Sequence, residues 1–124
     1  MAEALTDEAR AFLERSRVGH LATADTGARP HVVPFCYAVL GDRVYFAVDE
    51  KPKAAGKTLR RLRNIAENAE VAIVVDVWDE DWTRLEYVLV RGRAAIVADA
   101  AEYDRALVRL RERYPQYREM RLER

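Results

Sequence analysis

The residues best suited to bind a ligand lie in one short basic stretch, KPKAAGKTLRRLR, at residues 51–63. It contains six basic side chains and no acidic one. The three lysines of the chain, Lys51, Lys53 and Lys57, all fall inside it, whereas eighteen arginines are spread over the sequence. Cationic groups gathered beside a helix N-terminus form a good site for a phosphate or carboxylate. The pattern therefore predicts a local anion site, and a solvated basic helix face is the alternative.

The end of this stretch is similar to a phosphate-binding P-loop, which needs a glycine five positions before its last glycine. Lys51 occupies that position, where its side chain would obstruct the backbone wrap around a phosphate, so nucleotide hydrolysis is disfavoured. Nucleic-acid binding is disfavoured as well, because single-strand binders interleave basic residues with aromatic ones. No aromatic residue lies between Phe46 and Trp78.

Other groups of reactive residues give weaker signals. His20 and His31 lie on predicted strands and Cys36 is the single cysteine, but nothing in the sequence places the three together. We expect Cys36 to be a buried small hydrophobe and each histidine to be a partly buried, hydrogen-bonded strand residue. The acidic cluster at residues 76–81 lacks the spacing of a calcium loop, so we predict a polar hairpin there and no metal site.

Composition limits the classes of protein to consider. The chain has 124 residues, half of them apolar, which predicts a single domain over residues 1–124. The 21 basic and 21 acidic residues cancel, so no global field would attract nucleic acid or an anionic membrane. We find no apolar run of the ~20 residues that a membrane-spanning helix needs and no export signal. With a single cysteine, this pattern favours a cytoplasmic location.

The elements that must position the basic stretch follow from hydrophobic periodicity and turn signals. Helical spacing predicts three helices, at about residues 7–16, along the apolar stripe 59–66, and around 103–110 before Pro115. Residues rich in β-branched and aromatic types predict strands at 18–24, 31–40, 43–48, 71–78 and 87–98. Gly41-Asp42 forms a tight hairpin signal between two of these strands, and Gly92 marks a bulge or bend in the last.

Five or six mostly antiparallel strands with helices at their margins predict a mainly β fold. We expect a small antiparallel β-barrel, closed or split, with short flanking helices, because closure removes exposed strand edges. A parallel wound sheet is disfavoured because the Gly41-Asp42 connection is too short for a crossover helix. The apolar strands 31–40 and 71–78, together with Trp78 and Trp82, offer more hydrophobic surface than one small barrel interior needs. This surplus predicts a homodimer.

Nearly the whole chain, about residues 5–120, resembles the flavin split-barrel superfamily named after pyridoxamine 5′-phosphate oxidase. The segments that carry the resemblance are PHVVPFCYAV, RVYFAVD, LRRLRNIAENAEVAIVVD and DEDWTRLEYVLVRGRAAIV. The KPK before LRRLRNI and the acidic hairpin DEDW are similar to the branch of probable deazaflavin (coenzyme F420)-dependent reductases. The resemblance implies a homodimer of split barrels with two cofactor sites between the subunits.

The resemblance also implies which residues surround the cofactor. The phosphate would lie among Lys51, Lys53, Lys57, Thr58 and Arg61. Main-chain groups of Val32, Val33 and Pro34 would line the tricyclic ring, and Trp78 and Trp82 would wall the site from the partner subunit.

The function implied is hydride transfer from coenzyme F420 to a conjugated or quinone-like small molecule. The alternatives are an FMN-dependent oxidoreductase on the same fold, or a non-enzymatic flavin- or haem-binding module in which His20 or His31 would supply the axial ligand. Because the cofactor carries the difficult chemistry, the absence of a catalytic triad is no objection. The substrate and the proton donor are not specified by the residues, although Tyr37 and His31 are candidates for the latter.

Overall fold

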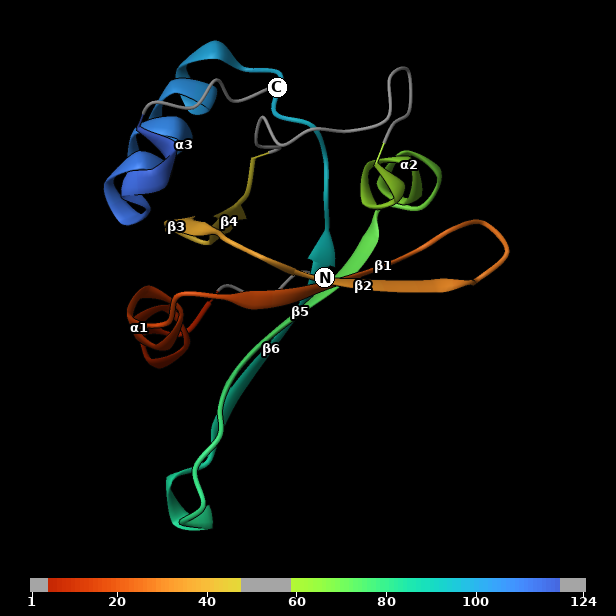
Figure 1. Ribbon diagram of the computed structural model, residues 1–124. Helices are drawn as coiled ribbons and strands as arrows, with labels where there is room; N and C mark the ends of the chain where they lie inside the picture. The colour runs from red at the N-terminus through yellow and green to blue at the C-terminus, as the bar shows by residue number, and fades with distance from the viewer. Residues whose placement is uncertain (1–4, 48–58, 119–124) are drawn as a thin grey trace. The chain divides into compact units, whose positions relative to one another are not determined.

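The computed structural model describes residues 5–47 and 59–118 (Figure 1). These residues form two compact units, the first from 5–36 and 59–95 and the second from 37–47 and 96–118. The prediction of one domain over 1–124 therefore stays a prediction. No helix in the described residues is long and apolar enough to span a membrane. The strands are β1 Gly19–Ala24, β2 Pro30–Phe35, β3 Ala38–Leu40, β4 Arg43–Tyr45, β5 Glu70–Val77 and β6 Glu86–Arg93, and the helices are α1 Asp7–Arg15, α2 Arg60–Glu67 and α3 Ala100–Arg113.

The first unit is built on a four-stranded antiparallel sheet in the order β2-β1-β5-β6. Side chains alternate between its two faces. On the inner face, Leu21 of β1 lies opposite Ile73 of β5, and both are buried together with Val75. On the outer face His20 lies opposite Val74, which in turn pairs with Leu89 of β6. Much of the outer face is exposed, and β5 and β6 continue beyond the other strands as a long hairpin (Figure 1).

The predicted strand 31–40 is wrong as one element, because it divides into β2 and β3, which belong to different sheets. The break lies at Tyr37, whose backbone groups are bonded by side chains. The Tyr114 hydroxyl accepts a hydrogen bond from the Tyr37 amide at 3.2 Å, and Arg113 Nε donates to the Tyr37 carbonyl at 2.8 Å. Backbone groups used in this way cannot join a strand ladder.

Strands β3 and β4 form a separate two-stranded sheet in the second unit. Their hairpin is confirmed: Leu40 pairs with Arg43 around the Gly41-Asp42 turn, and Gly41 has a φ of +59°. That conformation is one that two-residue hairpins require and glycine adopts without strain.

The last strand is shorter than predicted and has no bulge. Gly92 pairs in register with Val71, and the strand ends at Arg93 because its partner β5 begins at Glu70. Arg93 and Glu70 also form an ion pair of 2.7 Å. The described strands are thus mostly antiparallel as expected, in two separate sheets, and no ladder among them closes a barrel.

The three helices lie where the periodicity predicted them. α1 begins after Thr6, whose hydroxyl accepts a hydrogen bond from the Ala9 amide at 3.0 Å, and it buries Phe12 and Leu13. α3 begins after Asp99, which caps it in the same way, and it ends before Pro115. The cap side chains satisfy amides that would otherwise lack partners, which explains these start points.

Candidate functional site

Most of the predicted phosphate site lies outside the described residues, namely Lys51, Lys53, Lys57 and Thr58. Arg61 lies on α2 and is half-buried. Its neighbours Arg60 and Arg63 are exposed, so the described part of the basic stretch presents two guanidinium groups to solvent.

Helix α2 is held against the inner face of the sheet by a buried polar contact. Asn64 Nδ2 donates to the Thr23 hydroxyl at 3.0 Å, and both residues are almost fully buried. The Asn64 Oδ1 atom has no hydrogen-bond partner among the described residues. Because an eight-residue helix is marginal by itself, docking through this contact and the neighbouring Ile65 fixes the position of the arginines on α2.

The predicted ring-binding strand β2 is the outer strand of the four-stranded sheet. Opposite residues of an antiparallel pair alternate between exchanging two hydrogen bonds and exchanging none. Pro30 and Pro34 have no amide hydrogen to donate, so they occupy positions that exchange no hydrogen bonds with β1. Val32 lies two residues from each proline and so takes the same kind of position, without hydrogen bonds to β1. Its amide N–H and carbonyl therefore face away from β1. Val33 has the opposite parity and lies across from Leu21 in the ladder.

The predicted polar hairpin between β5 and β6 is confirmed, and its carboxylates organise its tip. The Asp81 carboxylate accepts hydrogen bonds from the Thr83 hydroxyl and amide, at 2.7 and 3.1 Å, and the hydroxyl bond is the main cause that lowers the pKa of Asp81. Asp79 accepts from the Asp81 amide at 2.7 Å, and Glu80 accepts from Trp78 Nε1 at 3.3 Å. These groups serve the turn. No cluster of three potential metal ligands occurs in the described residues.

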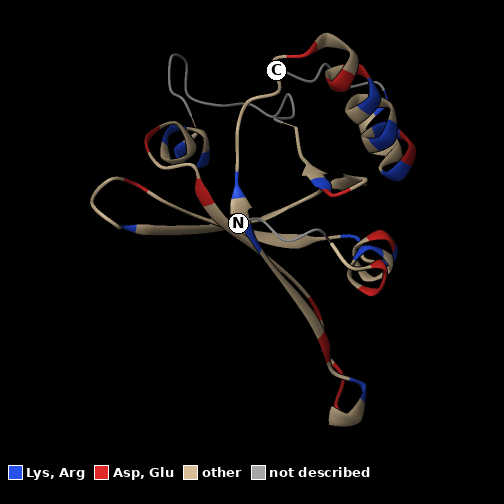
Figure 2. Cartoon of the chain, turned by 180° about the vertical axis from the view of Figure 1, so that it is seen from behind, with Lys and Arg blue, Asp and Glu red and all other residues tan. Residues whose placement is uncertain are grey.

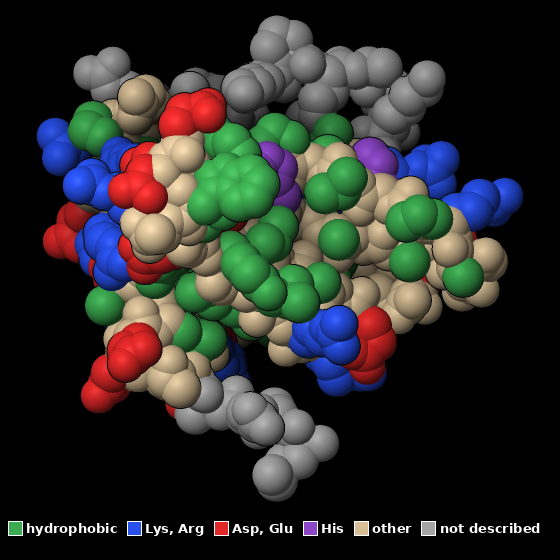
Figure 3. Space-filling view, turned by 90° about the horizontal axis from the view of Figure 1, so that it is seen from below, with side chains coloured by type: hydrophobic (Ala, Val, Ile, Leu, Met, Phe, Trp, Pro, Cys, Tyr) green, Lys and Arg blue, Asp and Glu red, His purple; other side chains and the backbone are tan. Residues whose placement is uncertain are grey.

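Trp78 and Trp82 stand at opposite ends of this turn and are exposed by 65% and 71%. Trp78 lines a groove in the first unit and Trp82 does not. In Figure 3 hydrophobic side chains gather in the middle of the face shown, next to histidine. Whether the two tryptophans wall a cofactor site stays a prediction.

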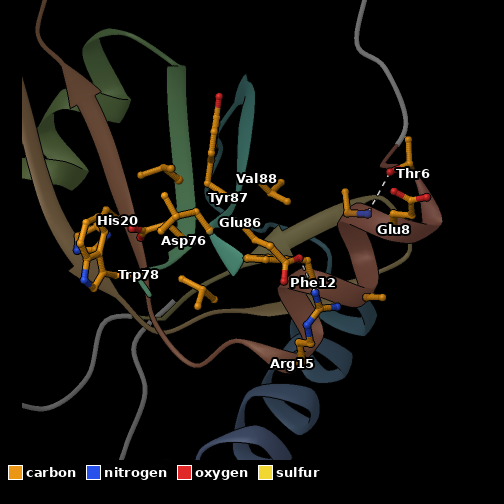
Figure 4. A pocket seen from close by; sticks show the side chains of 15 residues that line it. Thr6, Glu8, Phe12, Arg15, His20, Asp76, Trp78, Glu86, Tyr87 and Val88 are labelled. Atoms are coloured by element: carbon orange, nitrogen blue, oxygen red, sulfur yellow. Dashed lines mark hydrogen bonds and ion pairs between the residues drawn. The ribbon is translucent and has the colours of Figure 1, made fainter. Parts of the chain in front are cut away.

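The groove beside Trp78 lies between α1 and the β5–β6 hairpin and has a volume of about 1120 Å³. Figure 4 shows His20 and Trp78 at one end, Glu8 at the other, and Asp76 and Tyr87 between them. Sequence reasoning missed this groove. Alternation along β6 places Tyr87 on the outer face, but its position opposite Asp76 is known only from the strand register.

An ion pair joins the two walls of the groove. Arg15 at the end of α1 contacts Glu86 at the start of β6 at 2.9 Å, and its guanidinium lies 4.8 Å from the centre of the Phe12 ring. An exposed pair of this kind contributes little stability, about 0–1 kcal/mol, so it bridges α1 and the hairpin without determining how they pack.

The two histidines and the cysteine do not form a catalytic group. His20 points to the outer face and His31, opposite Thr23, to the inner face. His20 is exposed, contrary to the expectation of partial burial, and Cys36 is half-buried rather than buried. Tyr37, a candidate proton donor, is fully buried in the second unit.

Comparison with known proteins adds a family and a set of folds. The family model described as pyridoxamine 5′-phosphate oxidase matches residues 6–124. A conserved hypothetical protein from Mycobacterium tuberculosis has a similar structure, with a TM-score of 0.72 and 24% identity over 91% of this chain and 66% of that one. The haem storage protein HutZ from Vibrio cholerae gives 0.70 and 16%, over 98% and 90% of the two chains.

A FAD-binding protein from Mesorhizobium loti gives a TM-score of 0.67 and 24% identity, over 96% of this chain and 82% of that one. At these identities the likeness concerns the fold alone. No curated protein matches the sequence significantly.

Proposed function

The chain belongs to the pyridoxamine 5′-phosphate oxidase family, and from this membership we propose that it is a flavin- or deazaflavin-dependent oxidoreductase. The specific proposal is that it holds coenzyme F420 and passes a hydride to a conjugated or quinone-like small molecule. FMN is the alternative cofactor on the same fold.

The observation that carries this proposal is the outer edge of β2, which pairs with no further strand among the described residues. Between two prolines that cannot donate, Val32 presents one amide N–H and one carbonyl away from the ladder. A tricyclic flavin or deazaflavin has acceptors and a donor along one edge of its pyrimidine ring. An isolated backbone donor next to a backbone acceptor on a rigid strand matches that edge and fixes its orientation.

Charge favours the deazaflavin over FMN. FMN carries one phosphate, whereas F420 adds a phosphodiester and a tail of glutamates. The basic stretch 51–63 contains three lysines and three arginines, which is more positive charge than one phosphate calls for. Arg60 and Arg63 are exposed and could meet the tail.

When bound, the reduced cofactor supplies the hydride. The roles left to this chain are binding the phosphate through Lys51, Lys53 and Lys57, orienting the ring at Val32, and excluding water with the exposed tryptophans. We assign the product's proton to solvent, because Tyr37 is fully buried and His31 is half-buried on the inner face of the sheet.

The proposal includes a second copy of the chain, with the cofactor between the two subunits. Its support is the apolar character of the outer sheet face on both sides of the groove residues His20 and Val74. Val32 is 63% exposed and Leu89 is 48% exposed, and Pro34 lies in the same row as Leu89. Sedimentation at micromolar concentration should report twice the chain mass. A monomer at that concentration would remove the shared cofactor site.

The orientation of the ring is tested by Val32→Pro. This change removes the outward amide without breaking the β1–β2 ladder, so the fold should persist while cofactor affinity falls by about 2- to 10-fold, the value of one hydrogen bond. Val32→Thr keeps the amide and the branched shape and should bind normally. Equal affinity for both variants would reject Val32 as the ring contact.

The phosphate site is tested by replacing Lys53 and Lys57 with alanine. Each change should weaken cofactor binding by about 10- to 100-fold, because charge-assisted hydrogen bonds contribute about 1.5–3 kcal/mol each. Arg105→Ala, on the exposed surface of α3, is the matched control and should bind normally. Unchanged affinity of the double lysine variant would reject the assignment.

The choice of cofactor is tested by titrating F420 and FMN at two salt concentrations. F420 should bind more tightly and lose more affinity at high salt, because screening weakens a multiply charged ligand more. Its turnover with a quinone acceptor is then followed by coenzyme fluorescence. Tighter binding of FMN at physiological salt would return the function to an FMN-dependent oxidoreductase.

A haem-binding module is the second candidate, favoured by one observation. His20 is exposed, makes no hydrogen bond among the described residues, and faces an aromatic-lined groove. Its imidazole is therefore available as an axial ligand for a haem iron bound in that groove. Two of the proteins with a similar fold are named for haem storage or haem binding. Titration with hemin should then give a Soret band that His20→Ala abolishes and His31→Ala retains. No spectral change with hemin excludes this candidate.

A further inference from the structure

The groove between α1 and the β5–β6 hairpin has the size and lining of a ligand site. Its volume of about 1120 Å³ slightly exceeds the roughly 300–1,000 Å³ of typical small-molecule pockets. Helix α1 forms one wall, and β1 with the β5–β6 hairpin forms the other. His20, Asp76 and Tyr87 line it from the outer face, whereas Glu86 and Val88 share the inner-face parity of Val75. Both walls belong to the first unit, and the Arg15–Glu86 ion pair spans them.

Aromatic rings are presented to solvent inside this groove. Trp78 is 65% exposed and Tyr87 is 72% exposed, and both line it. Large exposed aromatic side chains that share a concave surface are suited to stack on a planar ring. The phenol of Tyr87 makes no hydrogen bond in the described part of the chain, which leaves it available to a ligand.

The charge of the groove is negative. Three carboxylates line it, from Glu8, Asp76 and Glu86, against the single cation of Arg15. Arg15 is already paired with Glu86. Neither Glu8 nor Asp76 forms an ion pair or hydrogen bond with another described residue. Figure 2 shows acidic residues along the hairpin toward its tip.

The groove is also separate from helix α2, which holds the described arginines of the basic stretch. Helix α2 packs on the inner face of the sheet, because Asn64 contacts Thr23, which alternates with the outward-facing His20 and Ala22. His20 lines the groove on the outer face. Helix α2 therefore packs on one face of the sheet, whereas His20, Asp76 and Tyr87 line the groove from the other face.

We propose that this groove binds a planar aromatic molecule that carries a positive charge, stacked on Trp78 and Tyr87 with its charge near Asp76. A cation gains both from the ring faces and from the carboxylates. Anionic ligands such as flavin phosphates and the propionates of haem meet like charge there. Binding at this site does not depend on a cofactor, and its use as the site of the hydride acceptor rests on the proposed function.

Three ring systems of equal size test the proposal: N-methylphenazinium, phenazine and phenazine-1-carboxylate. Each is titrated by calorimetry, in the dark, into the full chain without cofactor. The cation should bind most tightly, neutral phenazine about fivefold more weakly and the anion most weakly, as expected for a screened charge at close range. Raising the salt concentration should weaken the cation and leave phenazine unchanged.

Two pairs of variants locate the site. Trp78→Ala should weaken all three ligands by about tenfold, the value of one stacking contact, whereas Trp82→Ala on the same turn should leave them unchanged. Asp76→Asn should reduce the preference for the cation over phenazine by about fivefold. Glu70→Gln removes a charge from the same strand outside the groove and should keep that preference. All four side chains are exposed, so the variants should fold.

Tighter binding of the carboxylate than of the cation would overturn the proposal, as would equal effects of Trp78→Ala and Trp82→Ala. The cofactor titrations separate this result from the function. If neither F420 nor FMN binds while N-methylphenazinium binds in an Asp76-dependent manner, the proposal that the groove binds an aromatic cation is supported and the proposed function is rejected.

Discussion

The buried contact that docks α2 allows a quantitative prediction about stability. Asn64 Nδ2 and the Thr23 hydroxyl lie 3.0 Å apart, and their residues are 1% and 3% exposed. Thr23→Val replaces the hydroxyl with a methyl group of similar shape, so it creates no cavity. It removes the hydrogen bond and leaves a buried amide donor without its partner, which costs about 1–3 kcal/mol. A domain of this size shifts by roughly 4 °C per kcal/mol, so Tm should fall by about 4–12 °C.

A double-mutant cycle isolates the contact from other effects. Replacing both partners, as in Thr23→Val with Asn64→Leu, removes the unsatisfied donor together with its partner and leaves two apolar side chains of similar volume. The double variant should therefore lose less stability than the two single variants added together, with a coupling of about 0.5–3 kcal/mol. Unfolding is measured in urea at one protein concentration, because dimerisation would make the midpoint depend on concentration.

Thr26→Val is the matched control for this cycle. The Thr26 hydroxyl contacts Glu67 at 3.2 Å and so also joins α2 to the end of β1, but both residues are exposed. Its loss should change stability by at most about 0.5 kcal/mol. A Thr23→Val variant as stable as Thr26→Val, or purely additive single changes, would refute the reasoning that burial of the amide decides the effect.

Three further changes have expected outcomes. The carboxyl pKa of Glu102 is lowered below its ordinary 4.5, mainly by the hydrogen bond from the Tyr45 hydroxyl and then by the one from Arg43. The stability that the ionised carboxylate contributes is therefore complete above pH 4.5 and is lost as pH falls through the lowered pKa. Glu102→Gln should flatten the decline of the urea midpoint below pH 4.5, and an unchanged slope would contradict this. A Cβ on Gly19 would lie 3.0 Å from two side-chain atoms of the core, whereas a Cβ on Gly92 would meet nothing within 4 Å. Gly19→Ala should therefore destabilise the protein by about 1–3 kcal/mol, and Gly92→Ala should lower Tm far less. Ala28 has a φ of 62°, a region that glycine adopts without strain, so Ala28→Gly should raise Tm, by about 0.5–1 kcal/mol of stability; a fall in Tm would contradict this.

The sequence by itself determined the local elements of this protein. The three helices, the hairpin at Gly41-Asp42 and the polar turn after β5 follow from signals within a few residues of each other. Periodicity shows which side of a helix is apolar, and a cap or turn residue acts on backbone groups beside it. Such features depend little on the rest of the chain, which is why residues 7–16 were predicted almost to the last residue.

The ends of strands and their partners were decided by the tertiary structure. The stretch 31–40 is apolar throughout, and its division at Tyr37 arises from contacts with Arg113 and Tyr114, more than seventy residues away. The last strand ends where its partner begins, although its own sequence remains apolar up to Ala98. A strand needs a partner for its backbone hydrogen bonds, and a single sequence does not show which residues will provide them.

Of the two candidate sites, one is visible in the sequence and the other is formed only by the tertiary structure. Contiguous charge made the basic stretch visible in the sequence, and its lysines remain a prediction because they lie outside the described residues. The groove was not visible, since Glu8, His20, Asp76 and Tyr87 come from four separate elements. Their proximity is a consequence of strand register and of where α1 packs. Residues distant in sequence meet only when the chain has folded, because register and helix docking are set by long-range packing.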